Sequence, residues 1–83
     1  MQAKKLAKGQ TENIGGAGGG AGVEVTATVQ PPTGVKMAQA TVNITYAKGG
    51  NSSIQLQFPG QARKFTDVTS FKNVGPAEVL ISW

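Results

Sequence analysis

The stretch that decides the fold is residues 40–58, ATVNITYAKGGNSSIQLQF. Its first and last parts alternate between apolar and polar residues, and the apolar positions are Ala40, Val42, Ile44, Tyr46, Ile54, Leu56 and Phe58. A period of two is typical of a β-strand with one buried face. Between the two parts, Lys48-Gly49-Gly50-Asn51 predicts a tight turn, because consecutive glycines supply the positive φ of short hairpins. The stretch therefore predicts an antiparallel hairpin.

The same period continues on both sides of this hairpin. Residues 23–30 alternate, and the prolines that follow end this strand because proline has no N–H for a ladder. Residues 35–39 either lengthen the strand that begins at Ala40 or form an irregular lead-in. Residues 73–76, Asn-Val-Gly-Pro, predict the last turn, and residues 79–83 alternate again as a final strand.

The segment from Arg63 to Val74 does not keep one parity. Phe65 and Phe71 fall on one face of an ideal strand, whereas Val68 and Val74 fall on the other. Either a bulge or bend lies near residues 67–70, or both faces of the strand are partly covered.

These signals predict an all-β domain over residues 23–83, built as a small antiparallel sandwich or barrel. Five or six short strands with regularly spaced turns, and no helical periodicity, are typical of both architectures. A domain of this size buries only ~60% of the surface of its unfolded chain. The sequence has no cysteine or histidine, which excludes disulfides and a Cys/His zinc site as supports. Docking onto other subunits is the remaining support, and we therefore expect a homo-oligomer or a component of a larger assembly.

Residues 1–22 predict a flexible, basic arm in front of this domain, because glycine loses the most backbone entropy when it is ordered. We expect the arm to become ordered only on assembly. Its candidate assembly residues are Lys4, Lys5, Lys8, Gly15, Gly16, Gly18, Gly19 and Gly20.

The side chains opposite the apolar stripes suggest a binding face. They are short or amide-bearing and uncharged, namely Thr26, Thr28, Thr41, Asn43, Thr45, Gln55 and Gln57. A free sheet face more often carries Lys and Glu. Such a face suits contact with another protein or a sugar, although threonine is also a good strand residue in its own right. Trp83 has the parity of Val79 and Ile81, so it either caps the core or anchors an interface.

The chemistry of catalysis is sparse in this sequence. Histidine and cysteine, the commonest general base and the most reactive nucleophile, do not occur. The four acids do not have the spacing of an oxygen-ligand metal loop. We expect a non-enzymatic protein with no catalytic, cofactor-binding or metal-binding residues.

The net charge of +4 is compatible with an anionic partner, and it also serves solubility. Phe65 and Phe71 lie near Arg63, Lys64 and Lys72, which is where a stacking platform for single-stranded nucleic acid would form in an OB-like barrel. This is one alternative function, and a carbohydrate-binding module is another.

Residues 71–83, FKNVGPAEVLISW, resemble a strand–turn–strand segment that is common in small β-modules of bacteriophage virions. The order of arm, hinge and β-domain also resembles that of viral coat proteins, in which an arm reaches a neighbouring subunit. The resemblance implies a structural role in capsid decoration, a tail or a fibre, and it carries over no functional residue. We expect no signal peptide, because no apolar h-region follows the charged start at residues 1–8. We expect no membrane span, because no apolar run approaches ~18 residues. The expected location is the cytoplasm at synthesis and then a virus particle.

Overall fold

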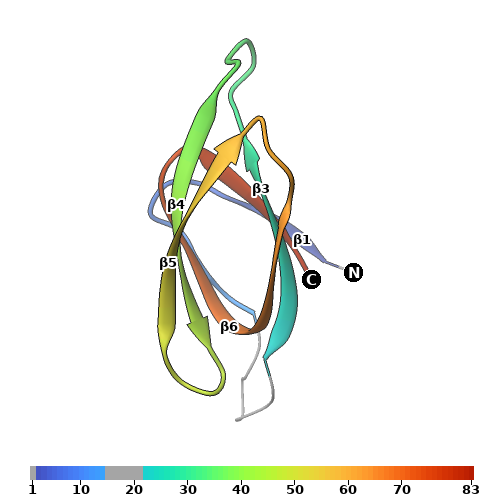
Figure 1. Cartoon of the computed structure of the whole chain (residues 1–83), viewed down its shortest axis with the longest axis vertical. Coiled ribbons are helices and arrows are strands. Elements are labelled where there is room, and N and C mark those ends of the chain that lie inside the picture. Colours follow the sequence, from blue (N-terminus) through green and yellow to red (C-terminus); the bar gives the residue numbers. More distant parts are fainter. Residues whose placement is uncertain (1, 15–21) are drawn as a thin grey trace.

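The computed structural model describes residues 2–14 and 22–83, and these form strands without any helix (Figure 1). The seven strands are β1 (Ala3–Leu6), β2 (Thr11–Asn13), β3 (Val23–Gln30), β4 (Ala38–Tyr46), β5 (Asn51–Phe58), β6 (Arg63–Pro76) and β7 (Glu78–Ser82). All pairings between them are antiparallel. The expected all-β antiparallel fold is confirmed, with more strands than the sequence indicated.

The strands belong to one sheet with the order β1-β7-β3-β6-β4-β5, and β2 pairs with β6 beside this path. Within the described residues no pairing joins the end strands β1 and β5, so the sheet is not closed into a barrel. The sheet folds over instead, and β3 contacts β4 and β5 across the core without pairing with them. The result is a sandwich-like molecule in which one layer holds β1, β7, β3 and the start of β6. The other layer holds β4, β5, β2 and the end of β6.

The hairpin of β4 and β5 forms as the sequence predicts. Its register runs from Ala38 opposite Phe58 to Thr45 opposite Asn51. Gly49 and Gly50 have φ values of 95° and 86°, which only glycine adopts readily. Because β4 begins at Ala38, the end of the ambiguous segment 35–39 lengthens the strand.

Strand β6 is bent and belongs to both layers. Its first half pairs with β3, and its second half pairs with β4 on one edge and β2 on the other. The register shifts three times, between Val23 and Val25 on β3, and between Thr45 and Tyr46 and between Thr41 and Val42 on β4. Asp67 lies at the bend with a φ of 61°.

The bend explains the mixed parity of this segment. Phe65, Val68 and Phe71 are separated by odd intervals, yet all three are buried. The shift on β3 and the one at Thr45 on β4 restore the inward direction that an odd interval would otherwise reverse. Of the two alternatives that the sequence left open, the bulge or bend near residues 67–70 is the one that the structure shows.

The predicted turn at residues 73–76 is wrong. These residues continue β6 and pair with β4, with Gly75 opposite Thr41 and Pro76 opposite Ala40. The chain then turns a corner at Ala77 into β7, which pairs with β3 rather than with β6. Turn-forming residues predicted a hairpin, but the buried side chain of Asn73 draws this segment into the core instead.

The N-terminal residues differ from the expected free arm. Strand β1 pairs with β7, with Leu6 opposite Val79, and β2 pairs with β6. Leu6 has no exposed surface and belongs to the core. Glycine, alanine and lysine make up most of residues 1–22. Strands of three and four residues are also too short to show a period. The glycines from Gly15 to Gly20 lie outside the described residues.

The core is apolar except for Asn73. It is lined by Leu6, Val25, Ala27, Val29, Ala40, Val42, Ile44, Leu56, Phe65, Val68, Phe71, Val79 and Ile81. Asn73 is fully buried, and its Nδ2 donates to the carbonyls of Leu6 at 2.9 Å and Ala77 at 2.8 Å. Its Oδ1 accepts from the Gly75 N–H at 2.8 Å. One side chain therefore joins β1, the bent strand and the corner that leads to β7.

We expect Leu6→Ala to lower the free energy of unfolding by about 2–5 kcal/mol, the usual cost of a cavity at a buried leucine. Urea unfolding followed by the fluorescence of Trp83 measures this change. Lys5→Ala is the control, because Lys5 is exposed on the same strand and its loss should cost less than about 0.5 kcal/mol. An unchanged stability of Leu6→Ala would mean that β1 does not pack on the core.

We expect Asn73→Ala to lower the free energy of unfolding by about 3 kcal/mol or more. It leaves several buried backbone groups without partners, and each costs about 1–3 kcal/mol. The same urea titration measures the effect, with the exposed Asn43→Ala as the matched control. Equal stabilities of the two variants would refute the role assigned to Asn73.

Candidate binding surface

The outward side of the layer formed by β2, β4, β5 and the second half of β6 is a continuous polar surface, which we call the polar face. Alternation along each strand directs its side chains away from the core. Its residues are Thr11, Asn13, Gln39, Thr41, Asn43, Thr45, Asn51, Ser53, Gln55, Gln57, Ser70 and Lys72.

Strand pairing sets the positions on the polar face. Thr41 lies opposite Gln55, and Asn43 lies between Ser53 of β5 and Lys72 of β6. The amide Nε2 of Gln55 donates to Oε1 of Gln39 at 2.7 Å. The face therefore consists mainly of hydroxyl and amide groups arranged in rows.

The polar face is nearly free of charge. Lys72 projects from it, and the exposed side chain of Lys8 lies over Gly75, opposite Thr41, at its border. No acidic residue belongs to it, although the chain has eight basic and four acidic residues, and all of these lie in the described part. The opposite layer presents charges of both signs outward, at Lys5, Glu24, Lys64 and Glu78. Mixed charges are typical of a solvated surface. The two sides of the molecule therefore differ in the charge that they expose.

The structure brings together most of the expected binding residues, namely Thr41, Asn43, Thr45, Gln55 and Gln57. Thr26 and Thr28 do not join them. Both lie on β3 in the opposite layer, next to Ser82 and Leu80 of β7. The alternation of a strand shows which residues point outward, but it does not show to which layer the strand belongs.

Several members of the polar face were missed in the sequence. Ser53 continues the alternation of Gln55 and Gln57 backward, so the pattern itself could have found it. Gln39 fell in the ambiguous segment before Ala40. Thr11 and Asn13 belong to β2, whose three residues carry no recognisable period.

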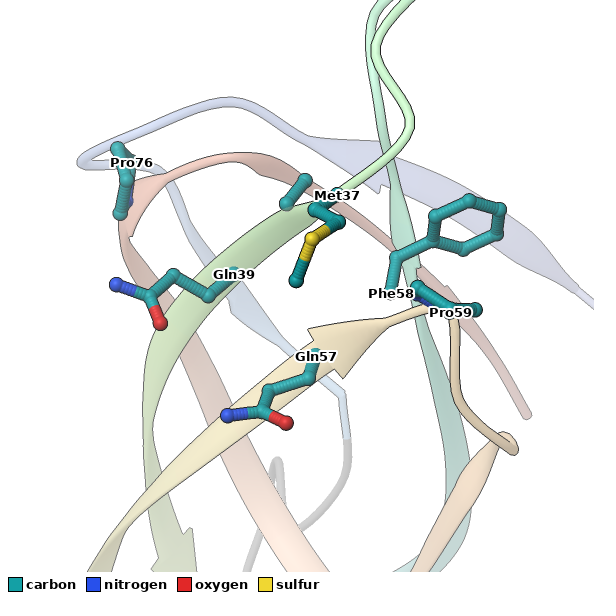
Figure 2. Close-up of a pocket in the computed structure, with 7 residues that line it drawn as sticks. Met37, Gln39, Gln57, Phe58, Pro59 and Pro76 are labelled. Atoms are coloured by element: carbon teal, nitrogen blue, oxygen red, sulfur yellow. The ribbon is translucent and has the colours of Figure 1, made fainter.

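An apolar depression lies at one end of the polar face. It has a volume of about 610 Å³ and is lined by Met37, Ala38, Gln39, Gln57, Phe58, Pro59 and Pro76. Figure 2 shows Met37 between Pro76 on one side and Phe58 and Pro59 on the other. The side chain of Met37 is 77% exposed, and the nearby loop also exposes Val35. An exposed methionine in a shallow apolar site is well suited to contact an apolar group of a partner.

The candidate lysines of the arm do not form one patch. Lys4 Nζ pairs with Glu12 Oε2 at 2.8 Å, so this charge is partly neutralised within the molecule. Lys5 lies opposite Leu80 on the outward side of β1. The side chain of Lys8 packs over Gly75, where it would meet any Cβ atom.

Trp83 is partly buried and packs against the core. Its backbone pairs with Gln2 in both directions, with N–H to carbonyl distances of 2.9 and 2.6 Å. This geometry is that of a residue that caps the core, one of the two alternatives that the sequence left open.

Phe65 and Phe71 cannot form the stacking platform considered from the sequence. Phe65 is 7% exposed and Phe71 is fully buried, with ring centroids 6.0 Å apart. The Arg63 guanidinium lies 5.9 Å from the Phe65 ring and covers its outer side. A base would find neither ring accessible.

No family model matches the chain, and the comparisons with characterised proteins and with solved structures also give no match. Within the described residues, no three His, Cys, Asp or Glu side chains converge as metal ligands would. The described part also has no helix that could cross a membrane. The polar face with its apolar end is therefore the feature on which a function can be argued.

We expect Trp83→Ala to lower the free energy of unfolding by about 1–3 kcal/mol, somewhat less than the loss of a fully buried aromatic residue. Urea unfolding followed by far-ultraviolet circular dichroism measures this, because the substitution removes the fluorophore. Met37→Ala is the control, since an exposed side chain contributes little to stability. A Trp83→Ala protein as stable as the parent would favour the interface anchor over the core cap.

Proposed function

We propose that this chain is a non-enzymatic structural protein that docks onto other protein subunits through the polar face. The observation that carries the proposal is the separation of charge: among the described residues only Lys72 and Lys8 bring charge to the polar face, whereas the opposite layer has mixed charges. A surface exposed only to water has no physical reason to exclude charge from one side.

The composition of the polar face fits a protein partner. Hydroxyl and amide groups exchange hydrogen bonds with water for hydrogen bonds with a partner at small net cost. Buried charges would add a desolvation penalty, and this face has almost none to bury. The apolar depression around Met37 supplies the burial that drives association, at roughly 25 cal/mol per Å². Protein interfaces usually combine apolar and polar contacts, and here the apolar part lies at one end of the polar face.

We place this docking in a virus particle, as a small capsid, tail or coat component. The support for this context is the resemblance of residues 71–83 to β-modules of bacteriophage virions. In the present fold β1 and β2 already pair within the chain's own sheet, so we assign docking to the polar face rather than to an arm of residues 1–22.

The two alternatives have less support. A sugar-binding module usually presents an exposed aromatic ring, whereas Tyr46 and Trp83 both pack against the core. A single-strand binder needs accessible aromatics beside basic residues, and Phe65 and Phe71 are covered.

The proposal predicts that a charge at the centre of the polar face abolishes docking. We expect Asn43→Lys to weaken binding at least tenfold to whichever virion subunit, among those encoded beside its gene, binds the full chain. Thr28→Lys is the matched control, because it adds the same charge to the opposite layer and should bind as the parent does. Calorimetry with purified subunits measures both.

Salt dependence separates this proposal from binding to nucleic acid. Docking through an uncharged face should weaken little as salt rises, whereas affinity for nucleic acid falls steeply through counterion release. Equal binding by Asn43→Lys and Thr28→Lys, or binding only to an oligonucleotide, would refute the proposal.

A further inference from the structure

One edge of the sheet is unprotected. Among the described residues no strand pairs with the outer edge of β5, which is eight residues long. Its sequence, NSSIQLQF, contains no charge and no proline, and the register with β4 runs without a shift. Natural sheets usually protect such edges with lysine, proline, bulges or short strands. None of these devices is present along β5.

The opposite end strand shows the contrast. Strand β1 has four residues, and two of them are Lys4 and Lys5. A short, charged edge discourages pairing with another chain. The chain therefore protects one end of its sheet and leaves the other open.

The free edge of β5 is not covered by the facing layer. A groove of about 220 Å³ separates it from β3, with Ala27 and Val29 on the side of β3 and Gln55 and Gln57 on the side of β5. Strand β5 is the end strand of the sheet and lies at the edge of its layer (Figure 1).

The phase of the hydrogen bonds identifies the backbone groups at this edge. In an antiparallel pair, residues bonded to the neighbour alternate with residues whose N–H and C=O point the other way. At the hairpin end the Tyr46 N–H donates to the Gly50 carbonyl at 3.2 Å. Two residues farther along each strand, the same register sets Ile44 opposite Ser52, so this pair is hydrogen-bonded as well. Even-numbered residues of β5 therefore bond to β4. Ser53 and Gln55 direct their N–H and C=O groups to the free edge, and Gln57 directs its N–H there, whereas Gly60 lies against the Gln57 carbonyl.

We propose that a second copy of this chain pairs with β5 along this edge, antiparallel and about a two-fold axis at Gln55. Charge does not oppose an identical partner at this edge: two chains of net charge +4 repel at most contacts, but β5 brings no charged side chain opposite its own copy. Two-fold pairing of identical strands is also the simplest closed assembly, because it satisfies both free edges at once.

The register follows from matching the side chains. An axis at Gln55 sets Ile54 of each copy opposite Leu56 of the other on the core side. On the outer side it sets Gln55 opposite Gln55, and Ser53 opposite Gln57. An axis at Ile54 would instead set Leu56 opposite the polar Ser52. Pro59 has no N–H and ends the new ladder opposite Asn51.

This pairing deepens the proposed function, because it would join two polar faces into one. Experiments can refute the dimer and the docking function independently of each other. Asn43→Lys should remove docking but leave the dimer intact, since Asn43 lies on β4, away from the free edge. A chain that docks while remaining monomeric would overturn the pairing alone.

Gln55→Pro tests the edge directly. The substitution removes an N–H that points to the free edge. It does not remove any backbone hydrogen bond between β5 and β4. We expect sedimentation equilibrium of the full chain to give a dimer that Gln55→Pro weakens at least tenfold and Asn43→Lys preserves. Amide exchange gives the same test without a substitution: the N–H groups of Ser53, Gln55 and Gln57 should gain protection with protein concentration, whereas that of Ile54 should be protected at all concentrations.

A single cysteine tests the register. The chain has no cysteine, so Gln55→Cys introduces one thiol per copy. Directly opposite hydrogen-bonded residues have Cα atoms about 5.5 Å apart, within the range that a disulfide spans. We expect oxidation to link Gln55→Cys into dimers and to leave Asn43→Cys unlinked. A parent chain that stays monomeric at the highest attainable concentration, or equal linking of the two cysteine variants, would overturn the proposal.

Discussion

The fold depends on the buried amide of Asn73. A fully buried polar side chain costs several kcal/mol unless each of its groups finds a partner. Here both ends of the amide are bonded, and its partners come from β1, from β6 and from the corner that leads into β7. Its backbone also bonds to Gly9 and Gln10 in the turn between β1 and β2. These requirements are met only when the first and last strands have both reached the centre of the molecule.

The sequence predicted the fold wherever its period was long enough to observe. Residues 23–30 and 40–58 gave their strands and hairpin directly, and the broken parity of residues 63–74 indicated the bend. The first strands could not be predicted in this way, because three or four residues show no period and Leu6 stands among polar neighbours. Asn73 misled the prediction because an asparagine two residues before a glycine is typical of a turn. Its burial depends on partners distant in the sequence.

The candidate surface was predictable in part for the same reason. Strand alternation found Thr41, Asn43 and the glutamines of β5, since direction away from the core is a local property. Whether Thr26 and Thr28 share a surface with them depends on how the sheet folds over, which no local pattern encodes. The near absence of charge from one side is likewise visible only after the layers are assembled. Placement of charge in the fold, rather than net charge, therefore carries the functional argument.

The bend at Asp67 has a further consequence for how this molecule opens. A sandwich made of two independent sheets can lose one sheet while the other persists. Here a single strand supplies hydrogen bonds to both layers. Separating the two layers therefore breaks the backbone hydrogen bonds that join β6 to β3 or to β4. Local opening is therefore confined to loops and edges, and the two layers denature as one cooperative unit.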